Sequence, residues 1–291
     1  MITLRDLAYV RVGTRDMEAQ LRFAQDIVGL ELVAVEGGTA YLRADDRHHC
    51  LAFVDGETIG TLASGFTLTD VAALEAAAAQ LEAEGLEVHR GTAEEARNRR
   101  VGDFISFVTP SGNPIDLVVG QVRLESRPVR FARPAGITEF GHIGIEVPDV
   151  ATAEDFWVRN FNIRVSDRIG ENASLTRFDP VHHKLALFKD VTNLGHVNFQ
   201  VESIDDVMRS WRFLEHHGVK ITMGPGRHPQ STAIFLYFEG PEGMTWEYSY
   251  GVRLIPDDMD WTPRTFDTSE PDFIDMWRGA LPTPTLPGTP A

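Results

Sequence analysis

Residues 141–166, GHIGIEVPDVATAEDFWVRNFNIRVS, match residues 8–33, AYVRVGTRDMEAQLRFAQDIVGLELV, in the order of their apolar and polar positions. Two further pairs of segments match in the same order along the chain: PVHHKLALF (180–188) with DRHHCLAF (46–53), and GPEGMTWEYSYG (240–251) with TPSGNPIDLVVG (109–120). Matching positions are separated by 131–134 residues. Similarity at a nearly constant spacing predicts that the chain consists of two duplicated halves.

The duplication divides the 291 residues into units of ordinary domain size. We expect an N-terminal domain, a linker that contains proline and arginine, a C-terminal domain and a tail, at residues 1–120, 121–136, 137–255 and 256–291. The tail ends in PTPTLPGTPA, and we expect this proline-rich end to be disordered.

Each half divides once more into a strand, a helix and several strands. Apolar spacing predicts helices at residues 16–28, 152–160, 69–85 and 203–218, with Thr69 as the N-cap of the third. Segments that alternate apolar and polar residues follow each helix and predict strands. The pattern occurs four times and therefore predicts an α+β fold in which helices pack against curved sheets.

The composition, 43% apolar and 24% charged, is typical of a globular protein. No run of about 18 apolar residues occurs, as a membrane span would need, and the first residues lack the pattern of a secretory signal. A formal net charge of −16 has the wrong sign for a phosphate-binding surface. The single cysteine, Cys50, excludes an internal disulfide and a cysteine-based zinc site. We therefore expect a cytoplasmic protein that binds neither nucleic acid nor membranes.

Three strand-like segments of the C-terminal half carry chemically useful side chains on one face. Alternate residues of a strand point to opposite faces, so HIGIEV, HVNFQV and MTWEYSY put His142, His196 and Glu247 opposite their apolar positions. In a curved sheet these faces would line one cavity. Two imidazoles and one carboxylate there would form a facial triad that leaves open positions on a divalent metal such as Fe(II).

The alternative is that these histidines are surface or hydrogen-bonded core residues, which is the commoner role of a single histidine on a strand. The duplication argues for the metal. The N-terminal half has Tyr9, Ala63 and Asp116 at the matching positions, so that one half would hold the metal and the other would be scaffold.

The motifs GHIGIEV, RVSDRIG, HHKLALF, GHVNFQV and GPGRHPQSTAIFLYFEGPEGMTWEYSYG together resemble the type I extradiol ring-cleaving dioxygenases, such as the catechol 2,3-dioxygenases and 2,3-dihydroxybiphenyl dioxygenases, of the vicinal oxygen chelate superfamily. The resemblance is dense over residues 138–251 and weaker over 5–120. It implies four βαβββ modules paired into two domains, each a curved open-barrel sheet with helices outside. It also implies that His142, His196 and Glu247 bind Fe(II), or Mn(II) in some members.

The resemblance assigns roles to three more residues. His183 matches the acid/base histidine, His228 matches a histidine that hydrogen-bonds the metal-bound substrate oxygen, and Tyr237 matches a tyrosine that contacts the substrate hydroxyl. Pro229-Gln230 departs from the pattern, because some members have a polar neighbour directly after this histidine. The implied reaction is O₂-dependent meta-cleavage of a vicinal aromatic diol in the degradation of aromatic compounds, with His183 accepting a proton from the diol and later returning one.

The other candidate residues fall into two groups. We expect structural or surface roles for His48, His49, His89, His216 and His217. We expect substrate contacts or pocket walls from Arg227, Gln230, Phe161, Phe178, Met223 and Trp246.

Two other functions remain open on the same modules. A glyoxalase or isomerase needs no O₂ and usually takes four ligands from both paired halves, whereas the N-terminal half offers Tyr9 and Asp116 but no matching histidine. A metal-free, drug-sequestering protein would not need the three ligands. We also expect a homo-oligomer, while the sequence leaves the particular diol and the choice between iron and manganese undecided.

Overall fold

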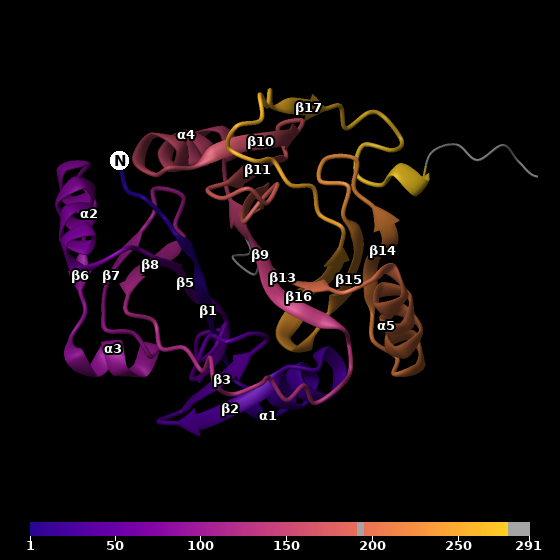
Figure 1. The fold of residues 1–291 in the computed structure, drawn as a ribbon, viewed down its shortest axis with the longest axis horizontal. Coiled ribbons are helices and arrows are strands. Elements are labelled where there is room, and N and C mark those ends of the chain that lie inside the picture. Colours follow the sequence, from indigo (N-terminus) through magenta and orange to yellow (C-terminus); the bar gives the residue numbers. More distant parts are fainter. Residues whose placement is uncertain (191–194, 279–291) are drawn as a thin grey trace, which may run out of the picture.

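The computed structural model describes residues 1–190 and 195–278, and its strands form two large sheets (Figure 1). The predicted disordered end, PTPTLPGTPA, lies outside the described residues. None of the helices in the described part has the length and apolar character needed to cross a membrane.

The N-terminal half supplies one sheet with the strand order β2-β3-β4-β1-β5-β8-β7-β6. Its strands are β1 (Asp6–Thr14), β2 (Glu31–Glu36), β3 (Thr39–Arg43), β4 (Leu51–Asp55), β5 (Gly60–Thr67), β6 (His89–Arg90), β7 (Asp103–Val108) and β8 (Pro114–Val119). Its helices are α1 (Met17–Arg22), which continues as a π-helical segment η1 (Phe23–Val28), α2 (Val71–Ala83) and α3 (Ala93–Arg99).

The C-terminal half repeats this order as β10-β11-β12-β9-β13-β16-β15-β14 and adds β17 beside β10. Its strands are β9 (Ile137–Val147), β10 (Arg164–Ile169), β11 (Ala173–Arg177), β12 (Leu185–Lys189), β13 (His196–Val201), β14 (Ile221–Arg227), β15 (Ile234–Glu239), β16 (Thr245–Tyr250) and β17 (Arg264–Phe266). Its helices are α4 (Val150–Asn160), α5 (Ile204–His216) and the short 3-10 turns η2 (Pro241–Gly243) and η3 (Met276–Arg278). The predicted α+β fold of four strand-helix-strand modules in two sheets is confirmed.

The helix limits follow from their caps, and one predicted cap is wrong. Asp70, not Thr69, begins α2, because the Asp70 carboxylate accepts the backbone N–H of Ala73 at 2.8 Å. The Thr69 hydroxyl instead accepts a hydrogen bond from Arg5 at 2.9 Å. Helix α3 was not predicted from the apolar pattern, because among its residues only Ala96 is buried. A capping box between Thr92 and Glu95 starts it instead.

Helices α1 and α4 each contact the opposite half of the chain, whereas α2 and α5 lie at the left and right edges of the view in Figure 1. Phe23, at the end of α1, packs against Trp246 of β16 with ring centroids 5.9 Å apart. Trp157 of α4 packs against Phe66 of β5 at 5.7 Å. One hydrophobic core therefore runs through both halves.

A buried ion pair fixes the segment that links the halves. Arg43 of β3 is fully buried and donates Nε to Glu31 at 2.8 Å. Its Nη2 donates to the backbone carbonyls of Arg127 and Pro128, both at 3.0 Å. The Arg130 N–H also donates to Glu31. Although burial alone would raise it, the pKa of Glu31 is lowered by these hydrogen bonds, so the carboxylate stays charged.

We expect Arg43→Met to lower the free energy of unfolding by about 3 kcal/mol, because it leaves the Glu31 carboxylate buried without its main partner. Urea denaturation followed by circular dichroism measures this loss. Arg22→Met is the control, since Arg22 pairs with Glu18 on the exposed face of α1 and such a pair contributes little. Equal stability of the two variants would contradict the prediction.

Candidate metal centre

Three neighbouring strands of the C-terminal sheet each supply one side chain to a single point. His142 lies on β9, His196 begins β13, and Glu247 lies on β16. Strand β13 pairs with β9 on one side and with β16 on the other. Ile143 and Trp246, next to two of these residues in the chain, point to the opposite face and join the hydrophobic core. Strand alternation therefore separates a core face from a polar face.

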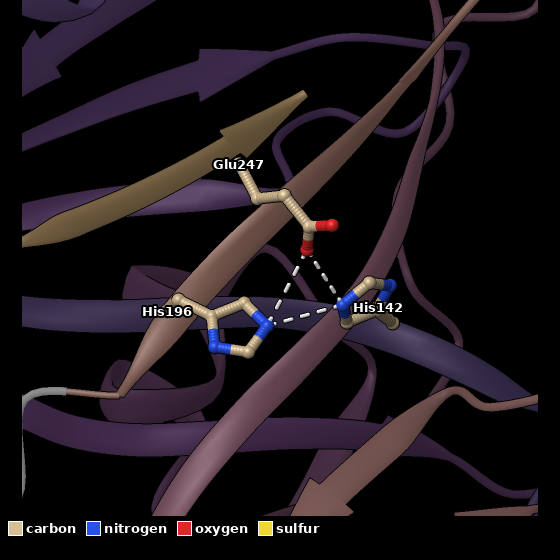
Figure 2. A group of neighbouring side chains, drawn as sticks. All are labelled: His142, His196 and Glu247. Carbon is tan, nitrogen blue, oxygen red and sulfur yellow. Dashed lines mark hydrogen bonds and ion pairs between the residues drawn. The ribbon is translucent and has the colours of Figure 1, made fainter. Parts of the chain in front are cut away.

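The structure brings these three side chains together in the predicted group (Figure 2). The carboxylate atom Oε2 of Glu247 lies 2.9 Å from Nε2 of His142 and 3.5 Å from Nε2 of His196. The two Nε2 atoms are 3.1 Å apart. Within residues 1–190 and 195–278, no second group of three metal-ligating side chains comes this close.

Burial keeps both imidazoles neutral. It lowers the pKa of His142 to about 3, helped by the nearby charge of Lys184, and it lowers the pKa of His196 to about 3 against the opposing effect of Glu247. The short contacts are therefore not ion pairs at neutral pH. Burial also raises the pKa of Glu247, and its Oε2 atom has no hydrogen-bond partner among the described residues. A buried carboxylate oxygen without a hydrogen-bond partner is costly unless a cation compensates it.

The donor set fits a divalent metal ion. Three ligand atoms about 2.1 Å from one ion and at right angles to each other lie about 3 Å apart. The observed separations of 2.9, 3.1 and 3.5 Å agree with this spacing. Two neutral imidazoles and one carboxylate are the donor set of non-heme Fe(II) sites that keep open positions.

Gly144 provides the space for one of the imidazoles. It lies opposite His196 in the β9–β13 pairing. A Cβ atom at this position would lie 2.3 Å from Cε1 of His196, which is far inside van der Waals contact. The glycine between His142 and Glu146 in HIGIEV is therefore part of the site.

A cavity of about 170 Å³ opens beside the three donors. His196, His183, His228 and Tyr237 are among its lining residues, so the structure places all three predicted acid/base or orienting side chains next to the donor group. The imidazole of His183 lies 4.2 Å from that of His142, measured between ring centroids. The apolar part of the wall comes from Ile169, Leu175, Phe188, Met223 and Ile274.

His228 is held rigidly at this cavity. Its Nδ1 atom lies 2.8 Å from the carbonyl oxygen of Ile274, so Nδ1 carries the proton and donates it. Its ring stacks on Phe235 with centroids 3.9 Å apart. Nε2 is then the acceptor and lies 3.2 Å from the Tyr237 hydroxyl. Burial raises the pKa of Tyr237 well above its usual value, as does the nearby Glu247, so this hydroxyl remains a donor.

Several predicted pocket residues lie elsewhere. Phe161, Phe178 and Trp246 belong to the hydrophobic core and are not among the residues that line the cavity. Arg227 is also not among the residues that line the cavity, and its Nε donates a hydrogen bond to the carbonyl oxygen of Thr232. Met223 and Gln230 do line the cavity, and Ser231, Thr245 and Ile274 are lining residues that the sequence pattern did not single out.

The equivalent place in the N-terminal half is filled by hydrogen-bonded side chains. The Tyr9 hydroxyl donates to Asp116 at 2.9 Å, and Arg99 pairs with Asp116 at 2.7 Å. Tyr9 also stacks on His49 at 5.2 Å. His48 lies beside His49, and His89 pairs with Glu95 at the surface. His216 ends α5 and His217 is its C-cap, and both are exposed.

Comparison with known proteins identifies the family to which the chain belongs. The family model described as the Glyoxalase/Bleomycin resistance protein/Dioxygenase superfamily matches residues 6–117 and 139–248. The chain belongs to this superfamily.

Individual relatives cover nearly the whole chain. An iron-dependent extradiol dioxygenase of Rhodococcus jostii (strain RHA1) is 29% identical over 95% of this chain and 97% of its own length. A manganese-dependent 2,3-dihydroxybiphenyl 1,2-dioxygenase of Geobacillus genomosp. 3 is 26% identical over 93% and 92% of the two chains. The crystal structure of BphC, a halotolerant catechol dioxygenase, superposes with a TM-score of 0.82 at 25% identity and covers 91% of this chain and 92% of its own.

We expect His196→Ala and Glu247→Gln to abolish stoichiometric metal binding, because the first removes one of three donors and the second removes the negative charge of the only anionic donor. Metal content after anaerobic loading with Fe(II), measured by mass spectrometry, tests this. His89→Ala, at the surface of the N-terminal half, is the control and should bind one ion per chain. Full metal content in both site variants would contradict the assignment.

We expect Gly144→Ala to weaken metal binding by at least about tenfold, because the new methyl group displaces the imidazole of His196. Titration with Mn(II), followed by the paramagnetic resonance of the free ion, measures the affinity. Gly56→Ala is the matched control, since nothing lies within 4 Å of a Cβ atom there. Unchanged affinity in Gly144→Ala would show that the imidazole does not depend on this space.

Proposed function

We propose that this protein is an extradiol dioxygenase, which uses O₂ to cleave the ring of a catechol-type vicinal aromatic diol at a mononuclear Fe(II) site, in the degradation of aromatic compounds. The observation that carries the proposal is the group of His142, His196 and Glu247 beside a cavity lined by His183, His228 and Tyr237. The extradiol dioxygenases among its relatives support the same reaction. Mn(II) is the alternative metal, because the same donors suit both ions.

The proposal also assigns a different role to each half of the chain. Residues 1–120 form a structural domain, 121–136 a linker, and 137–255 the catalytic domain, followed by the tail from residue 256. The end of the first sheet at Val119 and the start of the second at Ile137 support these limits. The Tyr9–Asp116–Arg99 cluster supports a scaffold role for the first half.

The chain's own residues would handle the protons of the substrate. Fe(II), when bound by His142, His196 and Glu247, supplies the Lewis acidity and electron transfer that allow a diol and O₂ to react. His183 is neutral, because burial lowers its pKa well below the usual value, and it accepts a proton from one diol hydroxyl. It returns this proton as the ring opens.

The other cavity residues would orient the ring. The Tyr237 hydroxyl, which donates its hydrogen to Nε2 of His228, would accept a hydrogen bond from one substrate hydroxyl. The apolar wall, which includes Phe188 and Met223, accommodates a flat aromatic ring and excludes water. Holding the diol in this orientation lowers the entropic part of the barrier.

The glyoxalase alternative has less support. It usually takes ligands from both halves, whereas Tyr9 and Asp116 bond to each other and to Arg99. The cytoplasm is the proposed location, on the basis of the single reduced cysteine, Cys50, which is a buried thiol. Homo-oligomer formation stays a prediction.

We expect the protein, loaded anaerobically with Fe(II), to consume O₂ with catechols and to release a yellow ring-opened product. An oxygen electrode and absorbance spectroscopy measure the two signals. His183→Ala should keep its metal but lose at least about 100-fold in kcat, because a general acid/base contributes this much. His48→Ala, in the histidine pair of the other half, is the control and should turn over normally.

A broad panel of substituted catechols identifies the preferred ring. A metal-loaded protein that consumes no O₂ with any of them would refute the proposed reaction. Turnover of a hemithioacetal without O₂ would favour the glyoxalase class instead.

A further inference from the structure

A chain of hydrogen bonds runs from the C-terminal segment to His183. Arg264 of β17 donates to Asp167 of β10 through Nε at 3.0 Å and Nη2 at 2.5 Å. Asp167 lies 2.9 Å from Nε2 of His182. Nδ1 of His182 lies 3.1 Å from Nδ1 of His183, which lines the cavity. Asp167 and His182 are fully buried.

The carboxylate at the centre of this chain can only accept hydrogen bonds. Although burial alone would raise it, the pKa of Asp167 is lowered by the hydrogen bonds from His182 and Arg264, so the group is ionised. The backbone N–H of Arg264 donates to the same carboxylate at 2.8 Å. Each neighbour of Asp167 must therefore be a donor.

The direction of each hydrogen bond then follows along the chain. His182 donates Nε2–H to Asp167, and burial lowers the pKa of His182, so this imidazole is neutral and its Nδ1 is an acceptor. The partner of that acceptor, Nδ1 of His183, must carry a proton. In a neutral imidazole, Nε2 is then the unprotonated atom and has a free lone pair.

We propose that Arg264, Asp167 and His182 are positioning residues that hold His183 in its Nδ1–H tautomer, with the lone pair of Nε2 left to accept a proton from a molecule in the cavity. This inference rests on the proposed function, in which His183 is the proton acceptor. The hydrogen-bonded neighbour of a histidine sets which ring nitrogen is basic, and a carboxylate is the usual means.

The N-terminal half provides an internal comparison. Its histidine pair, His48 and His49, has the same arrangement, with the two Nδ1 atoms 3.4 Å apart. Ala34 pairs with Tyr41 there as Asp167 pairs with Leu175. A methyl group thus replaces the carboxylate in the half that has Tyr9 and Asp116 in place of metal ligands. The carboxylate occurs together with the metal-binding residues.

The variant Asp167→Asn tests the chain directly. Its amide can accept hydrogen bonds from Arg264 through the oxygen and donate one to His182 through the nitrogen. The hydrogen bond between residues 167 and 182 and the one between His182 and His183 then both reverse direction. His183 is left with its proton on Nε2. We expect kcat with a catechol to fall at least about 100-fold, with KM changed less than about threefold. Asp155→Asn is the control, because Asp155 lies on the exposed surface of α4 with its side chain 73% exposed.

A second measurement reads the tautomer without turnover. Long-range ¹H–¹⁵N spectra of the full-length, metal-free protein with labelled histidine distinguish Nδ1–H from Nε2–H. We expect Nδ1–H at His183 in the wild type and in Asp155→Asn, and Nε2–H in Asp167→Asn. If Asp167→Asn does not fold, His182→Phe replaces it, because this variant keeps the Arg264–Asp167 pair. It should lose the tautomer preference and lower kcat.

These measurements test the positioning role of Asp167 separately from the proposed function. An unchanged tautomer at His183 in a folded variant, or a changed tautomer with wild-type kcat, would overturn the positioning role. A wild-type protein that consumes no O₂ with catechols would refute the proposed function instead, and the spectra would still show whether Asp167 sets the tautomer.

Discussion

The structure depends on one electrostatic requirement, which is the compensation of the Glu247 carboxylate in the interior of the C-terminal sheet. Both neighbouring imidazoles are neutral, so neither supplies a positive charge. A cation held by all three side chains would supply this positive charge. The strand order β16-β13-β9, the glycine at position 144 and the hydrogen bonds around the cavity all act to keep these donors in one place.

Much of the fold could be predicted from the sequence because the chain repeats itself. The matching segments around His142 and Tyr9 lie on β9 and β1, which are equivalent strands of two sheets with the same order. Strand alternation then placed His142, His196 and Glu247 on one face without any knowledge of the pairing. The alternation is clear because an apolar or aromatic residue directly follows each of these three residues on its own strand.

Other features depend on contacts between distant residues and leave no local pattern. Asp70 and Thr69 are both good N-cap residues, and in the structure Asp70 caps α2 while Thr69 accepts a hydrogen bond from the distant Arg5. The core positions of Phe161 and Trp246 depend on how the halves pack. The Asp167–His182 contact is likewise invisible in RVSDRIG and HHKLALF until β10 and the residues before β12 come together.

The contacts of the α1 and α4 regions with the opposite half have a consequence for how such a chain can evolve. Each half covers apolar surface of the other, as Phe23 covers Trp246 and Trp157 covers Phe66. A fragment that contained only the second half would expose aromatic rings to water and aggregate, so the two copies must persist as a pair after gene duplication. The first copy therefore needs no metal ligands of its own, provided that it preserves its share of the common interior.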